Sequence, residues 1–131
     1  MHKTNISDSL ESAVVIAITG GIASGKSQVA DFLRKRNFEV ISTDILAKIV
    51  METNPEVKKQ IHSKFGNQTY SIDGKLNSKL LSEIVFGNNL DPDQISKLNS
   101  IVHPPTIEMM IAEVEKLILQ GNRLVFVESA L

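Results

Sequence analysis

Apolar residues recur along the chain in two patterns, one typical of buried strands and one typical of helices. Residues 13–19 form a short β-branched run with apolar side chains on both faces, which predicts a parallel strand covered by helices on both sides. From Lys26 onward the spacing is helical, and the basic residues 34–36 fall at the expected helix end, where we expect solvated side chains. Residues 38–42 predict a second strand, which completes a β-α-β unit with a right-handed crossover.

Between this second strand and residue 123 the pattern is mainly helical. A turn is expected at Asp73-Gly74, and Pro104 and Pro105 are expected to end one helix and start another. Two methionines, at 109 and 110, are expected as core filling rather than as a binding surface. Residues 124–127 return to strand character. The apolar spacing predicts helices after Asp44, from Pro55, and around residues 80–85, 95–102 and 107–118.

Composition narrows the class of protein. A chain of 131 residues with 42% apolar residues can form one compact core. Its net charge of −1 offers no large positive field, so neither nucleic acid nor a membrane surface is an expected partner. The absence of cysteine excludes disulfides and thiolate metal sites. No apolar run approaches the ~20 residues of a membrane span, and residues 1–12 lack the features of a secretory signal. We therefore expect a cytoplasmic protein with residues 1–12 as a flexible leader.

One segment has the spacing of a phosphate-binding loop. Residues 20–27 match G-x-x-x-x-G-K-[ST] at every defined position and lie between a predicted strand and a predicted helix. Glycines let backbone N–H groups approach phosphate oxygens, and the helix start adds its positive dipole end. Lys26 is expected to reach the β- and γ-phosphates of ATP, and Ser27 to place its hydroxyl on Mg²⁺. The alternative is a chance glycine-rich turn. The expected nucleotide-binding residues are Gly20, Gly21, Ile22, Ala23, Ser24, Gly25, Lys26, Ser27 and Gln28.

These elements in order predict an α/β fold of the P-loop nucleoside triphosphate hydrolase type. Residues 13–44 and 123–131 would form the parallel-sheet core, and residues 45–122 a helical insertion subdomain. Only about three strands are predicted, so we expect an incomplete sheet and a truncated polypeptide.

Two further residues are candidates for chemistry. Asp44 follows the second strand, at the edge where open α/β sheets bind ligands, and could take a proton from an attacking hydroxyl. It could equally cap the helix that starts at Ile45. Taken by itself, His103 is most simply explained as the residue before a helix that starts at Pro104. His2 and His62 have no metal-ligand partner at useful spacing.

Four stretches, in this order, carry a resemblance to a known family: residues 18–27, residues 40–44 with Ala47, Asp73-Gly74 followed by residues 84–86, and Leu98-Asn99 leading to His103-Pro104. Over nearly all of residues 16–131 the chain resembles dephospho-CoA kinases. The resemblance implies transfer of the γ-phosphoryl of ATP to the ribose 3′-hydroxyl of dephospho-CoA, which yields CoA and ADP. It also implies that Asp44 and Lys26 are catalytic, that Asp44 and His103 contact the substrate, and that the helical insertion closes over the CoA end.

The chain departs from this family at several positions. Ser42-Thr43-Asp44 stands where the family often has Asp-Ala-Asp, and Ser78 stands where arginine is common. Family members also continue with further strands and a lid carrying arginines. Two alternatives to the kinase hypothesis therefore stay open: a nucleotide-binding fragment without turnover, and another small-molecule or nucleotide kinase. The oligomeric state is not predicted, although an uncovered strand edge would favour self-association.

Overall fold

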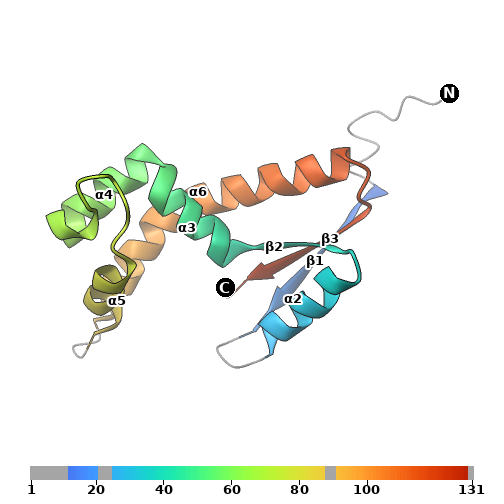
Figure 1. Cartoon of the computed structure of the whole chain (residues 1–131), viewed down its shortest axis with the longest axis horizontal. Helices are drawn as coiled ribbons and strands as arrows, with labels where there is room; N and C mark the ends of the chain where they lie inside the picture. The colour runs from blue at the N-terminus through green and yellow to red at the C-terminus, as the bar shows by residue number, and fades with distance from the viewer. Residues whose placement is uncertain (1–11, 21–24, 88–90, 130–131) are drawn as a thin grey trace. The chain divides into compact units, whose positions relative to one another are not determined.

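The computed structural model describes residues 12–20, 25–87 and 91–129 (Figure 1). These residues divide into two compact units, one with the residues up to Leu46 and from Glu108 onward, the other Ala47–Ile107. The predictions for residues 1–11 and for Gly21, Ile22, Ala23 and Ser24 concern residues outside the described ones.

The first unit contains a parallel sheet of three strands in the order β1-β3-β2. Strand β3 (Leu124–Ser129) lies between β1 (Val14–Thr19) and β2 (Glu39–Ser42) and pairs with both in parallel. The two strands of the predicted β-α-β unit are therefore not neighbours, because a strand from the far end of the chain separates them. The predicted α/β fold with a parallel core and a sheet of few strands is confirmed.

Helices lie on both sides of this sheet. Helix α2 (Lys26–Lys35) contacts all three strands, and Figure 1 shows it on the side of the sheet opposite the C-terminal half of α6 (Pro92–Leu119). Val125 and Val127 of β3 are buried in a cluster with Ile118, and both methionines of α6 pack against that cluster, as expected. Phe126 points to the other face, where its ring meets Phe38 edge to face at 5.5 Å between centroids.

The expectation that β1 is buried on both faces is wrong for the described residues. Val14, Val15 and Ile16 are all exposed, at 54%, 48% and 41%. Strand β1 is at the edge of the described sheet, and its β-branched residues fit a strand conformation without being covered.

The second unit is helical. Its buried apolar residues come from α3 (Thr43–Thr53), α4 (Pro55–Phe65), α5 (Ser78–Phe86) and the first half of α6. A short 3₁₀ turn, η1 (Asn67–Thr69), contacts α4 and α5. The core of this unit consists of Val50, Val57, Ile61, Phe65, Leu81, Val85, Ile101 and Val102.

Helix α6 does not end at the proline pair, contrary to the expected restart. Pro104 and Pro105 lie inside one helix of 28 residues. The φ angle of proline is itself helical, so its cost is a lost N–H donor and a clash with the preceding turn, which packing can offset. Here the packing includes buried Val102 and Thr106, and the Thr106 hydroxyl donates a hydrogen bond to the carbonyl of Val102 at 2.7 Å.

Candidate active site

The ends of the glycine-rich segment lie where the motif requires them. Gly20 follows β1 directly, and Gly25 precedes the first residue of α2, Lys26. Gly25 has a φ of 83°, a left-handed conformation that side chains with a Cβ rarely adopt. A residue other than glycine would therefore strain the entry to α2.

The start of α2 is suited to an anion. No acidic side chain occupies its first turn, so none of the helix's own residues neutralises its positive end. Lys26 is half-buried at the first helical position, and Ser27 and Gln28 follow it on the exposed side. Backbone N–H groups at such an end have no partner within the helix and can bind phosphate oxygens.

A carboxylate at the end of β3 faces this helix. Glu128 is 9% exposed, and its Oε1 accepts a hydrogen bond from the Ser27 hydroxyl at 3.5 Å. Its Oε2 lies 3.9 Å from a guanidinium nitrogen of Arg34, near the other end of α2. Arg34 also donates to the carbonyl of Val40 at 3.5 Å and pairs with Asp31. Residues 34–36 are exposed at the end of α2, as expected, and Arg34 in addition reaches the buried carboxylate of Glu128.

Sequence reasoning missed Glu128, although a signal was present. An apolar run, residues 124–127, is followed at once by a carboxylate at the carboxyl end of a parallel strand. In P-loop enzymes a carboxylate in this position helps the P-loop serine or threonine to hold Mg²⁺. The sequence pattern alone is common. The contact with Ser27 is the observation that makes Glu128 a candidate site residue.

Asp44 lies at the same edge of the sheet. Helix α3 begins at Thr43, directly after β2, so Asp44 sits in its first turn and is not the residue that caps a helix starting at Ile45. The Ser42 hydroxyl accepts the backbone N–H of Ile45 at 3.4 Å instead. Among the described residues, the exposed carboxylate of Asp44 makes no hydrogen bond or ion pair. The capping interpretation is thus excluded, and the carboxylate is available to a ligand.

Two contacts join the ends of β2 and β3. Ser42 and Glu128 are partners in the parallel register, and the Thr43 hydroxyl donates to the carbonyl of Glu128 at 3.0 Å. On the other side of β3, Thr19 pairs with Ser129, and Gly20 follows Thr19. The carboxyl edge of the sheet therefore brings together the start of the glycine-rich segment, Glu128 and Asp44.

His103 lies in the second unit, inside α6. Its half-buried imidazole makes no hydrogen bond or ion pair with any residue that the structure describes. His62 is exposed in the last turn of α4.

The described residues contain neither a metal-binding cluster nor a membrane-spanning helix. They include no group of three or more His, Cys, Asp or Glu side chains arranged to hold a metal ion. None of the helices they form has both the length and the apolar character needed to span a membrane.

Comparison with known proteins places these features in a family. The sequence model of dephospho-CoA kinase matches residues 14–131. A dephospho-CoA kinase of Fusobacterium nucleatum is 38% identical over 119 residues, which are 88% of this chain and 60% of that protein. A solved structure from Thermus thermophilus superposes with a TM-score of 0.67 at 31% identity, covering 90% of this chain and 56% of that one. The solved structure of a dephospho-CoA kinase from Campylobacter jejuni superposes with a TM-score of 0.66 at 26% sequence identity. This match covers 88% of this chain and 56% of that one.

The chain spans a little over half the length of the relatives that it matches, 60% of the Fusobacterium protein and 56% of each solved structure. The match nevertheless includes β1, both ends of the glycine-rich segment, Asp44 and Glu128, which are the parts that form the candidate site. On these grounds the chain belongs to the dephospho-CoA kinase family.

Proposed function

We propose that this protein transfers the γ-phosphoryl group of ATP to the ribose 3′-hydroxyl of dephospho-CoA, which yields CoA and ADP. The observation that carries the proposal is the convergence of Ser27, Glu128 and Asp44 at the carboxyl edge of the sheet, beside a helix start suited to phosphate. Family membership supports the choice of phosphoryl donor and acceptor.

Lys26 and the N-terminal turn of α2 would bind the β- and γ-phosphates. The Ser27 hydroxyl and the Glu128 carboxylate fit Mg²⁺, since this ion is usually held by one or two protein oxygens together with substrate phosphates. When bound, Mg²⁺ would neutralise charge that develops on the transferred group. Arg34 would keep the Glu128 carboxylate turned towards Ser27.

Asp44 would act on the acceptor. Its free carboxylate would accept the proton of the ribose 3′-hydroxyl as that oxygen forms a bond to the γ-phosphorus. The bond from the γ-phosphorus to the bridging oxygen would break, and ADP would leave with the negative charge. His103 and the helical unit would contribute to acceptor binding.

A coupled assay of ADP release tests the proposal. The 131-residue chain with MgATP is measured with and without dephospho-CoA, beside Asp44→Asn and the control Asp93→Asn, which changes an exposed carboxylate in the first turn of α6. We expect ADP release to depend on the acceptor and to fall about a hundredfold or more in Asp44→Asn, because a positioned base contributes about 10²–10⁴ in rate. Asp93→Asn is expected to keep the wild-type rate.

Three results would count against the proposal in different ways. Equal rates for the two variants would remove Asp44 from the chemistry. Binding of MgATP with no acceptor-dependent ADP release, while a full-length relative is active, would leave this chain as a nucleotide-binding unit without turnover. A faster reaction with a nucleoside or nucleotide than with dephospho-CoA would favour the other kinase alternative.

A further inference from the structure

Asp44 keeps its place in the candidate site through its backbone. Among the described residues its carboxylate makes no hydrogen bond or ion pair, so no side-chain contact fixes it. The Thr43 hydroxyl donates to the carbonyl of Glu128 at 3.0 Å. The Ser42 hydroxyl accepts the backbone N–H of Ile45 at 3.4 Å. Contacts on both sides of Asp44 therefore restrain the turn that carries it.

Of these two bonds, the one from Thr43 joins segments that are distant in the sequence. Ser42 and Ile45 are three positions apart, so their bond stays within one turn, whereas Thr43 and Glu128 are 85 positions apart. The parallel register of β2 with β3 ends at the pair of Ser42 and Glu128. The Thr43 hydroxyl thus continues the connection to β3 past the last pair of the ladder, into the first turn of α3.

The other end of this bond is a well-fixed part of the site. Glu128 is 9% exposed and lies on β3, which has a strand partner on each side. Its carboxylate also contacts Ser27 and Arg34. Thr43 is half-buried, and its β-branched side chain has few rotamers, so the bond restricts the backbone as well as the hydroxyl. The first turn of α3 is therefore fastened to the strand that carries the contact with Ser27.

We propose that Thr43 is a positioning residue that holds Asp44 at a fixed distance from Glu128 and Ser27. In the proposed function Asp44 acts on the acceptor hydroxyl, whereas Ser27 and Glu128 lie on the side of the phosphoryl donor, so this distance governs how the two substrates meet. A misplacement of about 1 Å can cost about a hundredfold in rate. The effect on catalysis rests on the proposed function, whereas the anchoring of Asp44 rests on the hydroxyl contacts alone.

Relaxation of backbone ¹⁵N nuclei tests the anchoring without any turnover. Thr43→Val keeps the β-branched shape and removes the hydroxyl, and Thr43→Ser keeps the hydroxyl. We expect the order parameter of the Asp44 N–H to fall from about 0.85, typical of rigid backbone, towards about 0.6 in Thr43→Val and to stay near the wild-type value in Thr43→Ser. Unchanged amide signals of Val125 and Val127 would show that the sheet is intact. An order parameter of Asp44 that does not fall in Thr43→Val would overturn the proposal.

Thr53→Val is the matched control, because it makes the same exchange at the other end of the same helix. The Thr53 hydroxyl donates to the carbonyl of Ile49 at 2.7 Å, so a bond of the same kind is lost within α3. We expect this variant to keep the wild-type order parameter of Asp44 and the wild-type rate. An equal fall in both variants would show that general loosening of α3, and not the contact with Glu128, is responsible, and would overturn the proposal.

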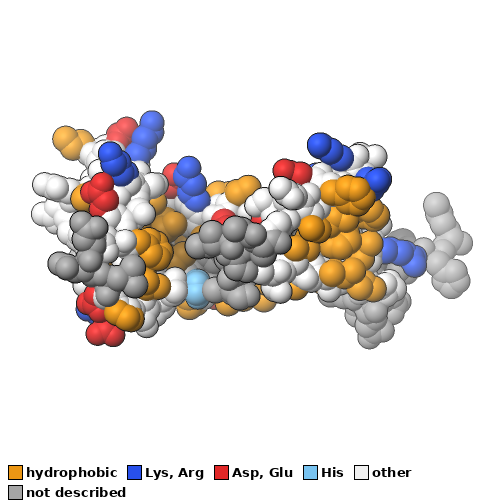
Figure 2. All heavy atoms as spheres, turned by 90° about the horizontal axis from the view of Figure 1, so that it is seen from below, with side chains coloured by type: hydrophobic (Ala, Val, Ile, Leu, Met, Phe, Trp, Pro, Cys, Tyr) orange, Lys and Arg blue, Asp and Glu red, His pale blue; other side chains and the backbone are white. Residues whose placement is uncertain are grey.

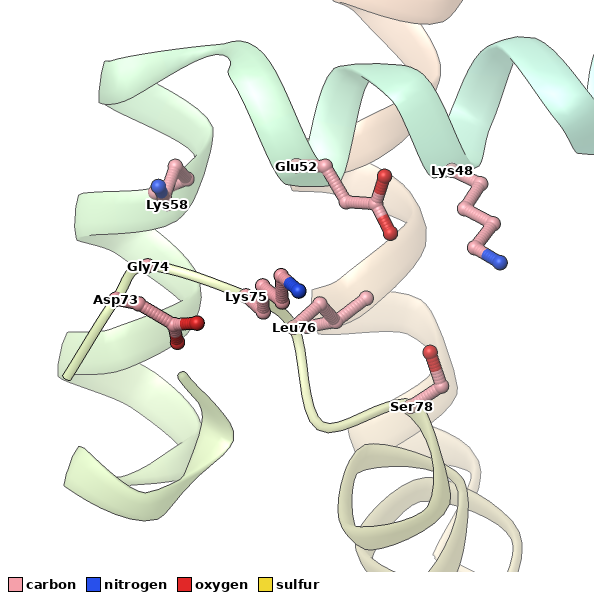
Figure 3. A pocket seen from close by; sticks show the side chains of 8 residues that line it. All are labelled: Lys48, Glu52, Lys58, Asp73, Gly74, Lys75, Leu76 and Ser78. Carbon is pink, nitrogen blue, oxygen red and sulfur yellow. The ribbon is translucent and has the colours of Figure 1, made fainter. Parts of the chain in front are cut away.

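The control also leaves the cavities of the helical unit unchanged. A cavity of about 410 Å³ there has side chains of both charges around a common space (Figure 3). A second cavity has a volume of about 250 Å³, and Thr53 lines neither of them. A change of rate in Thr53→Val would therefore not come from a lost side chain of these cavities. The charged residues of the larger cavity are Lys48, Glu52, Lys58, Asp73 and Lys75.

Kinetics of ADP release test the effect on catalysis. We expect Thr43→Val to lower kcat about tenfold and to leave the KM for ATP unchanged, because Asp44 is misplaced while the start of α2 is kept. Thr43→Ser is expected to recover most of the rate. In an Asp44→Asn background, Thr43→Val is expected to have no further effect on kcat, since no base is left to misplace. A tenfold loss in that background as well would show that Thr43 does not act through Asp44 and would overturn the proposal.

Failure of this proposal and failure of the proposed function give different results. If ADP release depends on dephospho-CoA and Thr43→Val keeps the wild-type kcat, the assignment of Thr43 is wrong and the function stands. If the chain releases no ADP, the proposed function fails for this chain, and the order parameter of Asp44 still decides whether Thr43 anchors it.

Discussion

Glu128 shows how one side chain can connect distant parts of the site. Its carboxylate lies between the hydroxyl of Ser27 and the guanidinium of Arg34, while its backbone carbonyl accepts the hydroxyl of Thr43. Ser27 and Glu128 are 101 positions apart in the sequence. The position of the Ser27 hydroxyl is therefore linked to β3 as well as to its own helix.

We predict that Glu128→Gln weakens the Mg²⁺-dependent part of nucleotide binding. Glutamine keeps the shape of the side chain but loses the charge, and changes around metal ligands typically cost about 10–100-fold in metal affinity. Titration of ATP with and without Mg²⁺ measures this, and the affinity for metal-free ATP is expected to stay near that of the wild type.

Glu39→Gln is the matched control for this prediction. Glu39 lies at the opposite end of the sheet, at the start of β2, and is exposed. An equal loss of Mg²⁺ dependence in both variants would show that overall charge, and not the contact with Ser27, is responsible.

Sequence reasoning at the residue scale succeeded where the signal is local. The G-x-x-x-x-G-K-[ST] spacing correctly placed the segment between a strand and a helix. It could not predict the contact of Arg34 with Glu128. A basic side chain near a helix end has the same local sequence pattern whether or not it reaches a buried carboxylate. The roles of Lys26, Asp44 and His103 remain predictions.

At the element scale, asparagine side chains cap the starts of two helices in the second unit, α4 and α5. Asn54 Oδ1 accepts the backbone N–H groups of Glu56 and Val57 at 3.0 and 3.1 Å, and Pro55 occupies the first helical position of α4. Asn77 Oδ1 accepts the N–H of Leu80 at the start of α5. These bonds satisfy donors that have no partner within the helix.

We expect Asn54→Ala to lower the free energy of unfolding of the helical unit by about 1 kcal/mol, because the two capping bonds of α4 are lost. Thermal unfolding followed by circular dichroism, together with hydrogen exchange of α4, measures the change. Affinity for MgATP is expected to stay the same, because Asn54 lies in the other compact unit.

Two further variants serve as controls for this measurement. Asn54→Asp keeps an oxygen acceptor and should restore most of the stability. Asn67→Ala changes an exposed asparagine whose side chain makes no hydrogen bond to a described residue, so it serves as the matched control. A loss in Asn67→Ala as large as that in Asn54→Ala would show that the cap is not the cause.

Helical periodicity predicted α2 to α5 and both halves of α6, since each of these helices has one apolar face. It divided α6 at Pro104 and Pro105 because proline disfavours a helix locally. Whether a helix continues through proline depends on the packing of its flanking residues, which a local pattern does not contain.

At the scale of the whole molecule, exposed apolar surface is the feature that bears on self-association. In the unit that holds the sheet, Val15 is 48% exposed on β1 and Val29 is 48% exposed on α2. Figure 2 shows apolar side chains gathered on the surface at the right of the view. Contiguous exposed apolar patches favour association, and β1 also has one edge without a strand partner among the described residues.

We predict that the 131-residue chain self-associates with increasing concentration and that Val15→Thr with Val29→Gln shifts the equilibrium towards monomer by about tenfold. Sedimentation velocity over a concentration series measures the equilibrium. Ile72→Thr is the control, because Ile72 is fully exposed but lies in the helical unit. A monomer at all concentrations, or an equal effect of Ile72→Thr, would contradict the prediction.

Local sequence determined the elements of this protein and the segment that is suited to phosphate, because periodicity, caps and glycine spacing act within a few residues. Tertiary structure alone decided which of these elements meet. It inserted β3 between β1 and β2, brought Glu128 to Ser27, and gathered the lysines of three separate segments around one cavity. Each of these depends on contacts between residues far apart in the chain, and such contacts leave no pattern in any one stretch of sequence.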